Sequence, residues 1–231
     1  MENNTEEIYD IWSDKLTIPI LALSIVIFTI YKWELCVITT RRKEWQDAGY
    51  ALPVWLVKKW FSLGDNFDMI LKEKTWITWV YKEQLYTFWD DVYQDPNGHV
   101  IAIAYFALVK IDDVLDQIDF EKVDIVTIQK QTEMKLFYKH EEVIHMALEK
   151  LKKRLGFTDI VKNFLPEECR ITQIQEIYEA ILGRKIDNRN FRKKIFSLKI
   201  IEETWEKDTS TNRPAKLYRF VDHRTNMIDS L

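Results

Sequence analysis

A two-domain α+β protein is predicted by three features of the 231-residue sequence. Apolar segments with the composition of buried strands lie mainly in the first half, as at residues 18–31 and 100–110. Amphipathic helical patterns dominate the second half. The segment Phe164-Leu-Pro-Glu167 interrupts these patterns and indicates a boundary. We therefore expect a first domain over residues 15–158, which ends in a linker helix, and a second domain over residues 159–224.

The first domain is expected to combine a strand hairpin, one helix, further strands and the linker helix. The expected strands are residues 18–31, 35–40, 81–88, 100–110 and 123–128, and the expected helices are residues 66–74 and 140–155. Residues 43–61 are expected to be irregular. Lys32-Trp33 would form the hairpin turn, which is unusual because two-residue hairpin turns favour Asn-Gly or Asp-Gly.

The second domain is expected to begin with two helices. Thr172 is predicted to cap a helix over residues 172–182, and Gly183 to end it. Asn188 is predicted to cap a second helix over residues 188–198. The apolar face of this second helix recurs at helical spacing and comprises Phe191, Ile195 and Leu198.

Two expected strands, residues 200–205 and 215–220, follow the second helix. Helix, turn, basic helix, strand, loop and strand is the order of a winged helix-turn-helix. Residues 184–199 contain seven Lys or Arg and one Asp, a local charge of +6, whereas the whole chain carries −4 and the remainder therefore −10. This asymmetry indicates a polyanion such as double-stranded DNA as the partner of one domain. The residues expected to contact DNA are Arg189, Asn190, Arg192, Lys193, Lys194 and Arg213.

A solvated helical face is the alternative interpretation, because runs of charge on helices are often no more than that. A second alternative is a protein interaction module in which the winged helix contacts protein. The two strands after the basic helix favour DNA over the first alternative. A protein contact would not require seven basic residues around one helix, which argues against the second.

Composition excludes several classes of protein. Hydrophobic residues make up 47% of the chain, which is enough for a core. Cys36 and Cys169 lie far apart in unrelated contexts, and the four histidines show no ligand spacing, so we expect no disulfide, no metal site and no cofactor. The apolar run at residues 18–31 is short for a membrane span, and the acidic N-terminus does not fit a signal peptide. A cytoplasmic location without membrane contact is the simplest expectation.

Several segments resemble a known family. Leu52-Pro53 and residues 71–77, 83–90 and 95–105 resemble a Nudix domain. Residues 177–184, 188–194 and 213–220 are similar to the winged helix of Nudix-related transcriptional regulators, which control NAD or sugar metabolism in bacteria. The resemblance implies a Nudix-like mixed-sheet α/β/α sandwich that senses a nucleotide sugar or sugar effector, followed by a DNA-binding winged helix. It also suggests that Arg41 and Arg42 meet the effector's phosphate. A homodimer is expected separately, because helix-turn-helix domains usually read two half-sites through a two-fold dimer.

The Nudix hydrolase motif is degenerate in this chain. Its consensus GX5EX7REUXEEXGU, with U an aliphatic residue, uses glutamates on one helix to hold divalent cations against a diphosphate. When this consensus is aligned with residues 55–77, the chain has Trp55 in place of the first Gly, Phe61 in place of a Glu, and Met69-Ile70 in place of Arg-Glu. Glu73 alone stands in register, since Lys74 replaces the second Glu of the final pair. We therefore expect no catalytic residues, although a Nudix hydrolase of a nucleoside diphosphate derivative such as ADP-ribose is the alternative function.

Tryptophan stands at several positions where the family, or the turn chemistry, would place glycine. These are Trp33, Trp55, Trp60, Trp76, Trp89 and Trp205. Glycine numbers only 5, whereas about 16 would be expected at roughly 7% usage. We hypothesise that the source reads UGA as glycine and that these tryptophans are glycine in the native protein. The losses at Phe61, Met69, Ile70 and Lys74 would remain.

Overall fold

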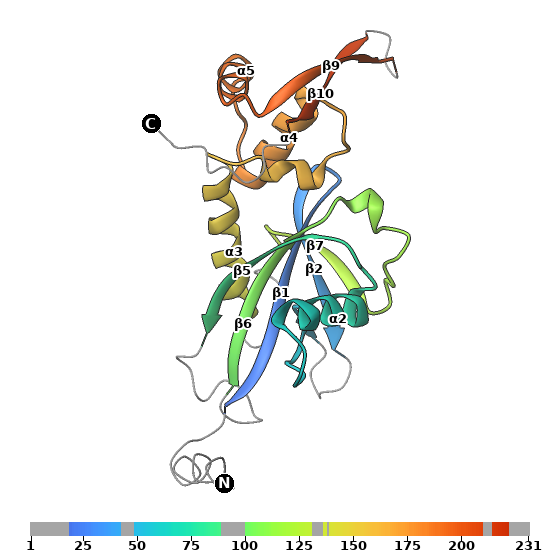
Figure 1. The fold of residues 1–231 in the computed structure, drawn as a ribbon, viewed down its shortest axis with the longest axis vertical. Helices are drawn as coiled ribbons and strands as arrows, with labels where there is room; N and C mark the ends of the chain where they lie inside the picture. The colour runs from blue at the N-terminus through green and yellow to red at the C-terminus, as the bar shows by residue number, and fades with distance from the viewer. Residues whose placement is uncertain are drawn as a thin grey trace, which may run out of the picture.

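A computed structural model of the protein describes residues 19–42, 49–88, 100–130, 136–137, 139–209 and 214–221. Its largest part is a mixed seven-stranded sheet built around β1, which is the central strand in Figure 1. The strands are β1 (Ile20–Tyr31), β2 (Glu34–Arg42), β3 (Gly49–Ala51), β4 (Val54–Leu56), β5 (Tyr81–Phe88), β6 (Val100–Leu108) and β7 (Val123–Thr127). β1 pairs parallel with β6 and antiparallel with β2 and β4. The strand order in the sheet is β3-β2-β1-β6-β5, and β7 also pairs with β2.

Helices cover both faces of this sheet (Figure 1). α2 (Leu63–Thr75) packs Phe67, Ile70 and Leu71 against side chains of one face of β1, and α3 (His140–Arg154) packs Ile144 and Leu151 against the other. This arrangement confirms the expected α/β/α sandwich. The buried apolar side chains of the sandwich form two clusters, one on each face of the sheet. They are separate because successive side chains of a strand point to opposite faces.

The structure corrects some boundaries in this part of the chain. Residues 43–61 are not wholly irregular, because β3 and β4 pair with β2 and β1 there. α2 begins three residues earlier than expected, since Ser62 caps it: Ser62 Oγ accepts a hydrogen bond from the Asp65 N–H at 3.1 Å, and Asp65 Oδ2 accepts one from the Ser62 N–H at 3.1 Å. Such a capping box extends the helix beyond the apolar stripe that predicted it.

The winged helix lies at one end of the sandwich (Figure 1). It comprises η3 (Ile160–Phe164), β8 (Cys169–Arg170), α4 (Ile171–Leu182), α5 (Asn188–Ser197), β9 (Ile201–Asp208) and β10 (Ala215–Phe220). β10 lies between β8 and β9 in a small antiparallel sheet. The predicted order is confirmed, and β8 is an additional strand that its two-residue length hid from the sequence analysis.

Both predicted helix caps in this domain are wrong. Arg170 occupies the N-cap of α4, two residues before Thr172, and its N–H donates to Gln173 Oε1 at 2.8 Å. Asp187, not Asn188, caps α5, and its Oδ1 accepts a hydrogen bond from the Asn190 N–H at 2.9 Å. Asp and Asn are both good N-caps, so composition alone did not separate the two neighbours. Gly183 ends α4 as predicted, in a left-handed conformation.

One continuous apolar core joins the two domains. Phe28 and Phe106 of the sheet, Ile144 of α3, Ile174 of α4 and Phe191 of α5 belong to the same cluster of buried side chains. Cys36 and Cys169 are buried free thiols. Within the described ranges, no helix is long and apolar enough to cross a membrane. The winged helix is therefore packed onto the sandwich and is not joined to it by a linker alone.

Candidate nucleic-acid interface

α5 presents a basic face to solvent. Phe191 and Ile195 are buried, and the Phe191 ring meets the Tyr178 ring of α4 edge-on, with 5.3 Å between centroids. The predicted DNA-contacting residues of this helix are all exposed on its other side; they are Arg189, Asn190, Arg192, Lys193 and Lys194. The structure thus brings five of the six together. The sixth, Arg213, lies outside the described residues.

The cations of α5 have no ion pair with any other residue that the structure describes, whereas two basic residues of β10, Lys216 and Arg219, are paired with glutamates of β9. Lys216 Nζ lies 2.9 Å from Glu203 Oε2, and Arg219 Nε lies 2.6 Å from Glu202 Oε1. These partners hold the pKa values of Lys216 and Arg219 above their usual range through hydrogen bonds and charge. Available positive charge in the described part of the winged helix therefore concentrates on α5, which points to phosphate contact by this helix rather than by the wing strands.

The predicted effector residue Arg41 is engaged within the protein. Its Nε and Nη2 atoms each lie 2.5 Å from a carboxylate oxygen of Asp124, in a two-point pair between β2 and β7. An effector phosphate would have to compete with this carboxylate or bind beside it. Arg42 ends β2, and its side chain lies outside the described residues. Effector binding by either arginine stays a prediction.

The acidic residues of α2 do not converge on one point. Glu73 Oε1 lies 3.3 Å from Lys58 Nζ, Asp68 Oδ1 lies 2.6 Å from Lys82 Nζ, and Asp65 is engaged by the helix cap. Among the described residues, no group of three His, Cys, Asp or Glu side chains is placed to hold a metal ion. The helix that carries metal ligands in a Nudix hydrolase is thus used here for capping and surface ion pairs.

Comparisons with known proteins identify both parts of the fold. Residues 161–220 match the family model described as the NrtR DNA-binding winged helix domain. The solved structure of Shewanella oneidensis NrtR complexed with a 27mer DNA is 25% identical, covers 87% of this chain and 93% of that one, and superposes with a TM-score of 0.77. The NUDIX domain of the same protein, complexed with ADP ribose, is 22% identical over 64% of this chain and 99% of that one, with a TM-score of 0.52. The chain therefore has an NrtR-type winged helix after a Nudix-like fold, which is the domain order of the Nudix-related transcriptional regulators that it resembles.

A curated relative shows the same resemblance. The ADPR responsive transcriptional repressor NtrR of Acinetobacter baylyi is 27% identical over 211 residues, which is 88% of this chain and 82% of the relative. The similarity therefore spans both domains of this chain and not only its winged helix.

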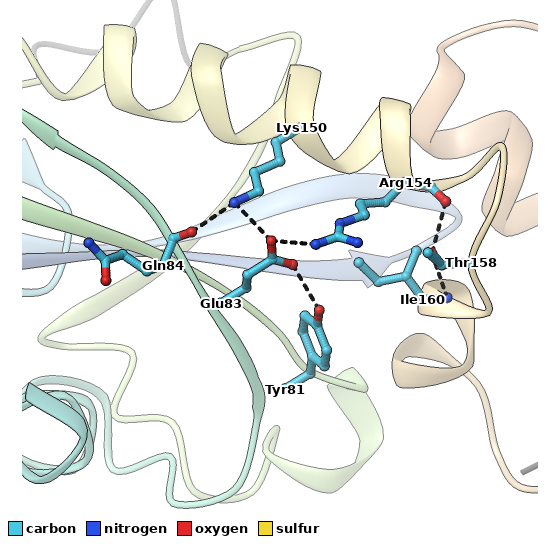
Figure 2. Close-up of polar contacts among 7 residues, drawn as sticks. All are labelled: Tyr81, Glu83, Gln84, Lys150, Arg154, Thr158 and Ile160. Atoms are coloured by element: carbon cyan, nitrogen blue, oxygen red, sulfur yellow. Dashed lines mark hydrogen bonds and ion pairs between the residues drawn. The ribbon is translucent and has the colours of Figure 1, made fainter. Parts of the chain in front are cut away.

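A polar cluster that the sequence analysis missed joins the large sheet to the linker helix α3 (Figure 2). Glu83 of β5 lies beneath α3, where its Oε1 atom is 2.8 Å from Lys150 Nζ and 2.7 Å from Arg154 Nη2, and its Oε2 atom accepts a hydrogen bond from the Tyr81 hydroxyl at 2.9 Å. Lys150 also donates to the Gln84 carbonyl oxygen at 2.7 Å. The sequence gives no local signal for these contacts, because Glu83 lies 67 or more residues away from both basic partners.

The protonation of Glu83 should affect stability. Burial raises its pKa, but the hydrogen bonds from Lys150, Arg154 and Tyr81 outweigh burial, so the pKa is lowered in the folded protein. A lowered carboxylate pKa contributes stability that is fully present above the unfolded value of about 4.3 and is lost as the pH falls through the folded value. We expect Glu83→Gln to lower the free energy of unfolding by about 1–3 kcal/mol at pH 7 and by much less at low pH.

Urea unfolding of the wild type and of Glu83→Gln between pH 7 and pH 3 measures this difference. Glu149→Gln is the matched control, because Glu149 lies on the surface of α3 and its one ion pair among the described residues is with Lys152, at 3.0 Å. A difference between wild type and Glu83→Gln that stayed constant down to pH 3 would contradict the assigned role of the carboxylate.

Proposed function

We propose that this chain is a DNA-binding transcriptional regulator, acting in the cytoplasm, whose catalytically inactive Nudix-like domain senses a nucleotide or sugar effector. The observation that carries the proposal is the exposed basic face of α5, held by a buried apolar face on a winged helix. A helix of this kind enters the major groove, where its N-terminal residues reach base edges. Arg189 and Asn190 are therefore assigned to base contact, and Lys193, Lys194 and Arg213 to phosphates.

ADP-ribose is the first effector to test. The Acinetobacter relative is named as ADPR responsive, and the NUDIX domain of Shewanella NrtR was solved with ADP ribose. Both support a nucleotide sugar as the ligand class of the sandwich. A sugar effector remains the second choice.

Selection of bound sequences from random DNA by the purified protein tests the DNA-binding function. Enrichment of a defined sequence is expected, and a selection that converges on none, with no binding to any duplex at low salt, would reject the proposal. Repeating the selection with ADP-ribose and with pentoses in the buffer identifies the effector class.

The regulator is expected to act as a homodimer on a pseudo-palindromic operator. Helix-turn-helix domains commonly read two half-sites about one helical turn apart through a two-fold dimer. Light scattering at micromolar concentration should give twice the chain mass, and the selected operator should show inverted half-sites. A monomer that bound a single half-site with full affinity would contradict this expectation.

We also expect the protein to have no Nudix hydrolase activity. Hydrolysis of a diphosphate by a Nudix domain needs several carboxylates on its metals, and Glu73 alone stands in register, paired here with Lys58. We expect no Mg²⁺-dependent release of AMP from ADP-ribose above the rate without protein. Turnover by the wild type that disappeared in Glu73→Gln, and survived in the matched surface variant Asp68→Asn, would instead show that this is an enzyme.

A further inference from the structure

The turn between α4 and α5 is tied down by a side chain in the interior. Gln175 of α4 is only 9% exposed. Its Nε2 atom donates toward three acceptors: the Ile186 carbonyl oxygen at 3.0 Å, Asn188 Oδ1 at 2.7 Å and Glu179 Oε1 at 3.0 Å. One side chain of α4 thus contacts both the end of the turn and the first residue of α5.

Glu179, one helical turn further along α4, holds the same turn from a second side. Its Oε1 atom accepts the Ile186 N–H at 3.0 Å, and its Oε2 atom lies 2.7 Å from Lys185 Nζ. The hydrogen bond from Lys185, followed by the backbone hydrogen bond from Ile186, lowers the pKa of Glu179 to about 2, so the carboxylate is charged at neutral pH. Both polar groups of the Ile186 backbone are therefore bound by side chains of α4.

We propose that Gln175 and Glu179 are positioning residues for DNA recognition, which set the angle of α5 without touching DNA themselves. The inference rests on the proposed function. The apolar contact between Tyr178 and Phe191 holds α5 against α4, but apolar packing is not directional and tolerates a small rotation. Hydrogen bonds are directional, and here they fix the backbone immediately before α5 and the side chain of its first residue. A rotation of α5 would move Arg189 and Asn190 relative to base edges while leaving the cations near phosphates.

Two kinds of binding therefore respond differently to loss of these bonds. Base readout requires atoms placed within hydrogen-bond distance, whereas phosphate contact depends mainly on net charge. In Gln175→Met, a substitution of similar shape, we expect the ratio of affinities for the selected operator and a scrambled duplex to fall about tenfold, comparable to the loss of one base contact. Affinity for the scrambled duplex and its salt slope should stay the same, because every basic residue remains.

The experiment compares wild type, Gln175→Met, Glu179→Gln and the control Glu176→Gln by fluorescence anisotropy on both duplexes over a range of salt. Glu176 lies on the same helix and makes no described hydrogen bond to the turn, so its variant should keep the wild-type ratio. Circular dichroism sets a temperature at which each variant is folded; if Gln175→Met does not fold, Asn188→Ala removes the same contact from the exposed side. An unchanged ratio in folded variants would leave these residues with a purely structural role and overturn the proposal. Absence of operator binding by the wild type would instead reject the proposed function.

A second inference comes from the backbone at four tryptophans. Trp33, Trp60, Trp76 and Trp205 have φ angles of 65°, 73°, 65° and 65°, in the left-handed region. Bulky side chains rarely adopt this conformation, and glycine adopts it freely. Their exposed fractions are 57%, 88%, 51% and 90%, so burial of the indole rings does not compensate for the strained backbone.

Each of three positions is one where a recognised motif calls for glycine. Lys32 and Trp33 are both left-handed in the two-residue turn between β1 and β2, and such turns favour glycine in second place. Trp76 is the left-handed C-cap of α2, with its N–H bonded to the Lys72 carbonyl oxygen at 3.0 Å. Trp205 lies opposite the register shift between Lys216 and Tyr218, where a bulge of this kind takes a left-handed glycine.

We infer that Trp33, Trp60, Trp76 and Trp205 are glycine in the native protein, because the source reads UGA as glycine. The inference does not extend to Trp55, whose φ is not left-handed, and Trp89 lies outside the described residues. No functional residue assigned above is altered by it.

The codons at these four positions are the direct test. UGA at all four supports the inference, as does a native protein whose mass is lower by four Trp-to-Gly differences, whereas UGG at any of them overturns it for that site. Recombinant protein with all four positions changed to glycine should melt higher than the tryptophan form, by roughly 2–4 °C for each site. The exposed Trp79, which lacks a left-handed φ, supplies the control Trp79→Gly, which should not raise the melting temperature.

Discussion

Phe191→Ala is expected to lower the free energy of unfolding of the winged helix by roughly 3–5 kcal/mol, enough to abolish DNA binding at 37 °C. Phe191 is buried in the core that joins α5 to α4 and to the sheet, and its ring meets Tyr178. Truncation removes this contact and leaves a cavity, because the backbone of α5 is also held at its start by the turn. Thermal unfolding followed by circular dichroism, beside binding to the selected operator, measures both effects.

Phe196→Ala is the matched control on the same helix. Phe196 is exposed at its outer side, although its ring lies 5.7 Å from that of Tyr218. Its loss should cost well under half as much as that of Phe191, because little surface is removed from water. Equal losses for the two variants, or a fully stable Phe191→Ala, would mean that α5 is not held by its apolar face.

Arg189→Ala should cost about 1–3 kcal/mol of operator affinity and relax the preference at one base pair, because the first turn of α5 is where a recognition helix reaches base edges. Lys193→Ala should weaken all duplexes alike and lower the salt slope by about one, since it removes one phosphate contact. Both side chains are exposed, so neither substitution should alter stability. A salt titration of binding on operator and scrambled duplexes distinguishes the two roles.

Lys72→Ala, at an exposed position of α2 far from the winged helix, is the control for loss of one positive charge. It should leave the salt slope unchanged. If Arg189→Ala and Lys193→Ala also left affinity and slope unchanged, the basic face of α5 would be only a solvated surface.

The C-terminal domain could be predicted from the sequence because its signals are local. The stripe of Phe191 and Ile195, the helix end at Gly183 and the basic run all lie within a few turns of one another, and helical periodicity converts such spacing directly into a face. The exposed positions of the five basic and polar residues of α5 follow from the same geometry. The winged-helix order was therefore correct even though both helix caps were misplaced by one or two residues.

The polar contacts that hold the elements together could not be predicted, because each depends on tertiary neighbours. In the sequence, Gln175 is an ordinary helical residue, and its hydrogen bond to Asn188 forms only because the turn packs against α4. Glu83 likewise pairs with Arg154 only because α3 packs across β5. The pairing of Arg41 with Asp124 likewise depends on β7 joining the sheet beside β2. A pattern in one sequence shows the period of a helix or strand and which of its faces is apolar. It does not show which charged residue from a distant part of the chain will lie opposite that element.

The short strands β3 and β4 were missed for a different reason. Each has three residues, too few for an alternating pattern, and Pro53 between them suggests a loop. Their strand character comes from pairing with the long strands β2 and β1, which supply the hydrogen-bond partners. Propensity is a weak guide wherever a neighbouring strand decides the conformation.

The central claim is that one chain couples an effector in its Nudix-like domain to DNA held by α5, and an effector titration of the DNA complex tests it most directly. The selected operator, labelled with a fluorophore and saturated with protein, is titrated with ADP-ribose, with AMP and ribose as controls. We predict that ADP-ribose changes operator affinity by about 5–150-fold, the usual range of coupling between two sites, and that operator DNA changes ADP-ribose affinity by the same factor. Operator affinity that stayed constant at ADP-ribose concentrations shown by calorimetry to saturate the protein would contradict the account.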